Sequence, residues 1–123
     1  MTNSDLVGKK LDVVLIDPWD FVTTNGSGPF IANVIRFGHD KSTGVECLVL
    51  ELALPLNYKT EEFGYFMATI RHEGRTFQQV LSDARIACNL TGIPTERLLG
   101  DDLLDMSWWR GGVAVIADLS LHK

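Results

Sequence analysis

The chain has few of the residues that build metal and redox sites, and it has no recognisable cofactor motif. Its two cysteines, Cys47 and Cys88, lie far apart in apolar segments, and no Cys-x2-Cys pair is present. The three histidines, His39, His72 and His122, show none of the spacings typical of metal ligands, so we expect no metal site. The one glycine-rich loop, residues 26–29, lacks the lysine of a phosphate-binding loop. We therefore expect no cofactor, and we expect both thiols to be buried and free.

Long apolar runs and an excess of basic residues are also missing. No run approaches the ~20 residues that a membrane-spanning helix requires, and the first residues have neither the basic nor the apolar part of a secretion signal. We therefore expect a cytoplasmic protein without a membrane segment. The 16 Asp and Glu residues outnumber the 11 Lys and Arg residues, which gives a formal net charge of −5. An acidic surface repels nucleic-acid phosphates and suits a basic protein partner.

What the chain does have is the size and apolar content of one globular domain. Its 123 residues are 46% hydrophobic and 22% charged. A chain of this size can bury a core without disulfides or metals. No repeat or linker interrupts it, so the sequence predicts a single domain over residues 1–123.

Apolar residues recur at every second position in several segments, which is typical of strands with one buried face. The clearest example is residues 111–121, where Val113 begins an alternating series that ends at Leu121. In residues 30–37 we expect Ile31, Ile35 and Phe37 to share a buried side. In residues 47–56 one face carries five leucines: Leu48, Leu50, Leu52, Leu54 and Leu56. The remaining predicted strands are residues 11–16, 65–71 and 86–91.

These strands predict a mainly β fold, an antiparallel barrel or strongly curved sheet of about six to seven strands. One or two short helices are expected near residues 94–106, because Pro94 and Gly100 fit the two ends of a helix. Residues 17–21 read as a capped turn and residues 23–29 as a loop.

One segment is ambiguous between strand and helix. Residues 76–84 begin with a capping-box pattern, but the short turn at Gly74 favours a paired strand, which we prefer. A helix over residues 76–84 would make the fold α+β, and a two-sheet sandwich is the other alternative.

Tryptophans beside charged residues are the first candidates for a binding surface. Adjacent residues of an extended segment point to opposite sides, so either Trp108 or Trp109 would face solvent next to Arg110. The alternative is that both rings close one end of the barrel. Three carboxylates precede this segment: Asp101, Asp102 and Asp105. Trp19 and Asp20 repeat the combination near the start of the chain.

Three functional hypotheses follow from these features. The first is a non-enzymatic protein-binding module, specifically an immunity or inhibitor protein that neutralises a basic bacterial toxin. The second is a small-molecule-binding barrel or an enzyme, with a site around Arg71, His72 and Glu73. There His72 would act as a general base oriented by Glu73, with Cys88 as a candidate nucleophile. The third is a homo-oligomer that pairs through an exposed tryptophan and edge strands.

Overall fold

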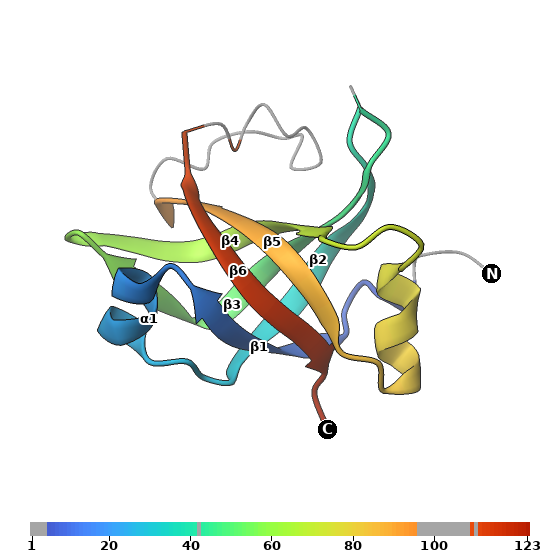
Figure 1. Ribbon diagram of the computed structural model, residues 1–123, viewed down its shortest axis with the longest axis horizontal. Helices are drawn as coiled ribbons and strands as arrows, with labels where there is room; N and C mark the ends of the chain where they lie inside the picture. The colour runs from blue at the N-terminus through green and yellow to red at the C-terminus, as the bar shows by residue number, and fades with distance from the viewer. Residues whose placement is uncertain (1–4, 42, 96–108, 110) are drawn as a thin grey trace.

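The computed structural model describes residues 5–41, 43–95, 109 and 111–123, and within them the chain forms a closed six-stranded antiparallel barrel (Figure 1). This confirms the mainly β fold predicted from the alternating pattern. The strands are β1 (Lys10–Asp17), β2 (Phe30–His39), β3 (Glu46–Tyr58), β4 (Glu61–Ile70), β5 (Ile86–Ile93) and β6 (Val113–Leu121). Two short helices accompany them, α1 (Trp19–Asn25) and the 3-10 helix η2 (Phe77–Ser82).

The barrel closes because the first strand pairs with the last. Each strand is antiparallel to the next one in the chain, and β1 pairs with β6 from Leu11 opposite Leu121 to Asp17 opposite Ile116. A closed wall leaves no free strand edge along its circumference. The hypothesis of a homo-oligomer that pairs through edge strands therefore gains no support from the wall of this barrel.

The interior is filled by the apolar residues that the period of two predicts. Leu48, Leu50 and Leu52 are buried on β3, and Phe66 and Ala68 face them from β4. On β6 the inward positions Val115, Ala117 and Leu119 are each at most 1% exposed. Small barrels are packed solid by their own side chains. A ligand site must therefore lie on the outer surface or at the rim.

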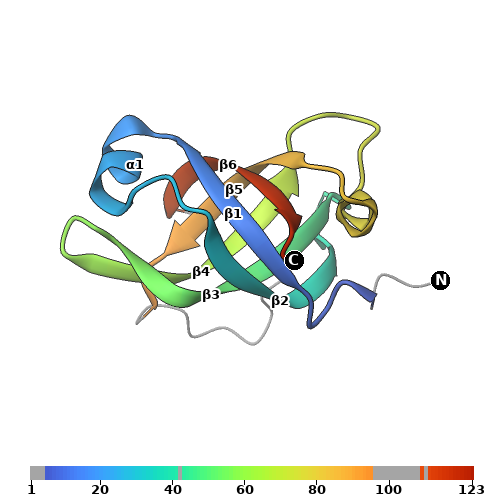
Figure 2. The same ribbon diagram turned by 90° about the horizontal axis from the view of Figure 1, so that it is seen from below.

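The two helices cover opposite ends of the barrel (Figures 1 and 2). Phe21 of α1 is fully buried at one end, with its ring centroid 6.3 Å from that of Phe63 and 6.4 Å from that of Phe66. Phe77 of η2 is fully buried at the other end, in an edge-to-face contact with Phe37 at 6.3 Å. Each end of the barrel is thus closed by one helix that inserts one phenylalanine.

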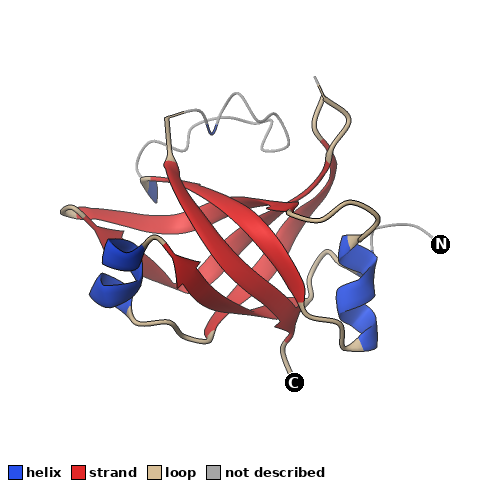
Figure 3. Ribbon diagram, viewed as in Figure 1, coloured by secondary structure: helices blue, strands red, loops and turns tan. Residues whose placement is uncertain are grey.

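The preference for a strand over residues 76–84 was wrong. Residues 77–82 form η2, and the capping box at its start is complete (Figure 3). The Thr76 amide donates to Oε1 of Gln79 at 2.9 Å, and the Thr76 hydroxyl accepts from the amide at the third helical position. These bonds satisfy two backbone amides at the start of the helix, which would need other partners in a strand. The capping contacts therefore favour the helix more than the short turn at Gly74 favours a paired strand.

A β-bulge changed the buried face of β2. Val34 lies opposite Leu50, but Arg36 lies opposite Val49, so Ile35 is the extra residue. The buried residues before the bulge are Ala32 and Val34, and the predicted inward residue Ile31 is 37% exposed. Only Phe37 of the predicted set packs against the interior core. The extra residue shifts by one position which residues of β2 point into the barrel. A strict period of two along residues 30–37 therefore assigns the wrong face before the bulge.

Two other expectations need correction. Residues 23–25, predicted as part of a loop, complete α1, and Gly26 ends that helix with a φ of 86°. Leu54 is 79% exposed because the register of β3 against β4 shifts between Glu51 and Leu56. The helices predicted near residues 94–106 fall almost wholly outside the described residues.

Neither α1 nor η2, the helices of the described segments, has the length and apolar character needed to cross a membrane.

Candidate functional site

Helix α1 places one aromatic residue in solvent and another in the core. Phe21 is fully buried, whereas Trp19, two positions earlier, is 76% exposed. The helix is anchored by Phe21 and by a pair of hydrogen bonds between Asn25 and the backbone of Asn57 on β3, at 2.8 and 2.9 Å. A tryptophan this exposed on a fixed element is typical of a binding surface, since most tryptophans are well buried.

The carboxylate of Asp20 is held beside this tryptophan. The Tyr58 hydroxyl donates to Oδ2 of Asp20 at 2.6 Å. This hydrogen bond, more than desolvation or the negative charge of Asp20, raises the pKa of the Tyr58 phenol. The Lys59 ammonium lies over the Tyr58 ring, 5.2 Å from its centroid. One oxygen of Asp20 is therefore held by a residue of the barrel, while the residue itself is exposed to solvent.

A groove on the outer wall of the barrel begins where α1 starts. Its volume is about 380 Å³, and Asp17 and Pro18, which directly precede Trp19, form one side. Strands β5 and β6 supply the remaining lining: Asn89, Leu90, Thr91, Ala114, Val115 and Ile116. We call the groove together with Trp19 and Asp20 the α1–β6 surface. It combines an exposed aromatic ring with a partly apolar depression, as protein-binding sites do.

The charges around the α1–β6 surface are mainly negative. Asp17 and Asp20 are exposed, and Asp118 lies two residues along β6 from the groove residue Ile116, on the same outer face. Arg71 contributes one positive charge, and its Nη1 donates to Oδ1 of Asn89 at 3.0 Å. Three carboxylates therefore lie here against two cations, Arg71 and the Lys59 that lies over Tyr58, in a chain whose formal net charge is −5.

Trp109 cannot serve as the exposed residue of a binding site, because its ring is only 2% exposed. It packs on the outer side of the barrel wall in a second apolar cluster with Cys47, Val49, Met67 and Ile93. Covering these outward-facing side chains removes apolar area from water, and this explains the burial. The other predicted binding residues of this region lie outside the described residues: Trp108, Arg110, Asp101, Asp102 and Asp105.

The predicted triplet Arg71, His72 and Glu73 forms an exposed bend and turn after β4. Cys88 does not share this exposed position. Its thiol is fully buried in the interior core, where desolvation raises its pKa from 9.0 to about 12. A thiol acts as a nucleophile through its thiolate, so Cys88 is poorly suited to the role considered for it.

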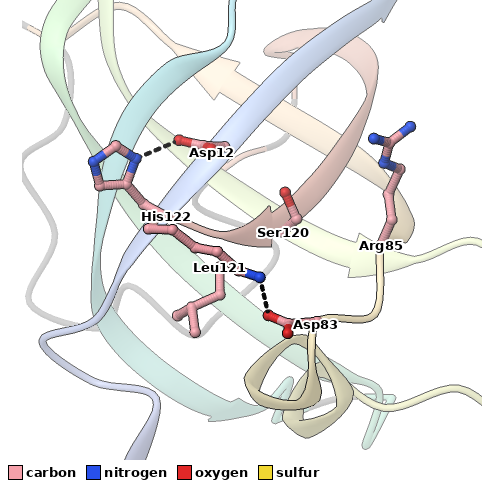
Figure 4. A pocket seen from close by; sticks show the side chains of 7 residues that line it. Asp12, Asp83, Arg85, Ser120, Leu121 and His122 are labelled. Carbon is pink, nitrogen blue, oxygen red and sulfur yellow. Dashed lines mark hydrogen bonds and ion pairs between the residues drawn. The ribbon is translucent and has the colours of Figure 1, made fainter.

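A second depression, of about 360 Å³, lies where the end of β6 meets η2, and the sequence analysis missed it (Figure 4). The imidazole Nδ1 of His122 is 2.7 Å from Oδ1 of Asp12, and Nζ of Lys123 is 2.8 Å from Oδ1 of Asp83. Arg85, Ser120 and Leu121 complete its lining. These residues come from three parts of the chain. The pairing of β1 with β6 sets Asp12 opposite Ser120, and the pairing of β5 with β6, which sets Ile86 opposite Leu119, brings Asp83 and Arg85 to the same end. Neither long-range pairing has a signature in a short segment of the sequence.

The described residues include no cluster of three or more His, Cys, Asp or Glu side chains arranged to hold a metal ion. The arrangement on the outer wall suits non-covalent recognition by one aromatic ring and several carboxylates. Comparison of the chain with protein-family models, with curated proteins and with solved structures found no match.

Proposed function

We propose that this protein is a small, acidic, non-enzymatic module that binds a basic partner protein through the α1–β6 surface. The observation that carries the proposal is Trp19, 76% exposed and directly beside the carboxylate of Asp20. Tryptophan is among the residues that contribute most binding energy at protein interfaces, because its large ring fills a pocket of the partner. The role we favour is an inhibitor or immunity protein that neutralises a basic bacterial toxin.

Charge supports a basic partner over an acidic or neutral one. Asp17 lines the groove, Asp20 follows it at the start of α1, Asp118 lies further along β6, and the whole chain carries −5. Complementary charge accelerates the encounter of two proteins and disfavours partners of the same sign. The hydrogen bond from Tyr58 holds Asp20 in place before binding, so less side-chain entropy is lost when a lysine or arginine arrives.

The test begins with the wild-type protein immobilised and used to capture binding proteins from extracts of its native host. The captured protein is purified, and its association and dissociation rates are measured at low and high salt. We expect Trp19→Ala to raise the dissociation rate about tenfold or more, because a hot-spot ring is lost. Asp20→Lys should lower the association rate about tenfold at low salt and much less at high salt.

Glu73→Lys is the matched control, because it makes the same change of charge on an exposed turn after β4. It should leave both rates close to wild type. A captured partner that is acidic, or one that binds Trp19→Ala and Asp20→Lys as tightly as wild type, would contradict the proposal. The inhibitor role predicts that the captured protein slows bacterial growth when expressed alone and not when co-expressed with this protein.

A further inference from the structure

The depression between β6 and η2 has a charge arrangement that differs from the rest of this acidic molecule. Its two carboxylates are each already paired: Asp12 with His122 at 2.7 Å, and Asp83 with Lys123 at 2.8 Å. The remaining charged side chain of its lining is Arg85. Within the described residues, the Arg85 guanidinium has no hydrogen-bond or ion-pair partner. The depression therefore offers a cation that the protein itself does not neutralise.

The fold holds these groups in fixed relative positions. Asp12 and Ser120 are direct partners in the β1–β6 ladder, and the His122 amide donates to the Lys10 carbonyl at 2.9 Å. Asp83 ends η2 in a left-handed conformation with a φ of 66°, and its amide donates to the carbonyl of Val80. Figure 4 shows Ser120 between the Asp12–His122 pair and Arg85.

The donors of this hollow suit an oxyanion. A guanidinium presents several N–H groups in a planar fork that matches two oxygens of a carboxylate or a phosphate. The Ser120 hydroxyl and the Lys123 ammonium are further donors in the lining of the hollow. The carboxylates of Asp12 and Asp83 would oppose an anion if they were free. The Lys123 ammonium, 2.8 Å from Asp83, offsets the repulsion from that carboxylate, and the imidazole of His122 contacts Asp12 at 2.7 Å.

We infer that this hollow, formed by Asp12, Asp83, Arg85, Ser120, His122 and Lys123, is a binding site for a small molecule bearing a phosphate or carboxylate group, with Arg85 as its main contact. The site is separate from the α1–β6 surface, because α1 and η2 cover opposite ends of the barrel. It does not depend on the proposed protein partner.

Amide chemical shifts of the full chain, titrated with inorganic phosphate and separately with acetate at constant ionic strength, test the inference. We expect saturable shifts centred on Ser120 and on residues 83–85, with the tighter of the two anions identifying the group that the site prefers. Arg85→Gln should weaken that binding about tenfold or more, because it removes the charge-assisted hydrogen bonds.

Arg36→Gln is the matched control, since Arg36 is an exposed arginine on β2 whose Nη1 donates to the neighbouring Ile35 carbonyl. It removes the same charge and should leave the titration unchanged. Saturation by neither anion, or equal binding by Arg85→Gln and wild type, would overturn the inference. A circular dichroism melt of each variant tests whether the fold is retained. A loss of binding can then be attributed to the substituted side chain and not to unfolding.

Discussion

The two cysteines illustrate how position in the barrel wall decides the chemistry of a residue. Cys88 points into the interior core, and Cys47 points outward into the cluster that Trp109 covers. Both thiols are free and fully buried. Desolvation is the main reason that the pKa rises from 9.0 to about 12 for Cys88 and to about 11 for Cys47. As expected from their apolar sequence surroundings, they are small core residues.

These raised pKa values predict that the protein loses stability in alkaline solution. In the unfolded chain both thiols ionise near pH 9, whereas in the folded protein they stay protonated. Above pH 9 the unfolded state therefore binds fewer protons than the folded state. The free energy of unfolding should fall as pH rises, by up to about 1.4 kcal/mol per pH unit for each thiol. Urea unfolding between pH 8 and 10.5 measures this slope.

Cys88→Ala serves as the comparison for that slope. The variant is expected to be less stable at every pH, because it leaves a small cavity, but its stability should decline less steeply above pH 9. Tyrosines and lysines titrate in both proteins, so the difference between the two slopes isolates Cys88. Identical slopes would show that the burial of this thiol has no effect on its ionisation.

At the scale of elements, α1 acts as a plug for the barrel and also as the support for Trp19. The two functions are separable, because Phe21 is fully buried and Trp19 is 76% exposed on the same helix. We expect Phe21→Ala to lower the free energy of unfolding by about 3–5 kcal/mol, through lost burial and the cavity that remains. Trp19→Ala should change it by no more than about 0.5 kcal/mol. Equilibrium unfolding in urea compares the two variants directly, and equal losses would mean that α1 does not close the barrel as described.

The elements also show what a single sequence can and cannot reveal about the fold. Period-two alternation located all six strands, because a barrel wall has one dry face along its whole length. Alternation assigned the wrong face around Ile35, where β2 has a bulge, and at Leu54, where the register of β3 against β4 shifts. Both segments remain as apolar as the regular parts of their strands, so the sequence gives no sign of the irregularity. The prediction also failed at residues 77–82, where the helix depends on the capping contact between Thr76 and Gln79.

The candidate sites were predictable only in part, for a related reason. Trp19 and Asp20 are adjacent in the sequence, so their combination could be identified there as a candidate for binding. Nothing local indicated that Trp109 would be buried, because its burial depends on outward-facing residues of β3, β4 and β5. Asp12, Arg85 and His122 come together only after β6 pairs with both β1 and β5, and these pairings have no signature in any short segment.

For the whole molecule, the pairing of β1 with β6 has a further consequence. In an open sheet the first and last strands would be edges and would open more readily than the centre. Here β1 and β6 each have two neighbouring strands, and their inward residues Leu11, Val13, Leu15 and Leu119 are buried. The terminal strands should therefore unfold only when the entire barrel unfolds.

Native-state hydrogen exchange measures this property residue by residue. We expect the most protected amides of β1 and β6 to exchange with a free energy within about 1 kcal/mol of that for β4, and close to the global free energy of unfolding. The Leu54 amide is the internal contrast, because the pairings of β3 with β2 and β4 skip residues 53–55. It should exchange at least about 2 kcal/mol below the global value. If β1 and β6 exchanged as readily as Leu54, the barrel would open at its closing seam in solution, and the hollow around Arg85, which is built across that seam, would open with it.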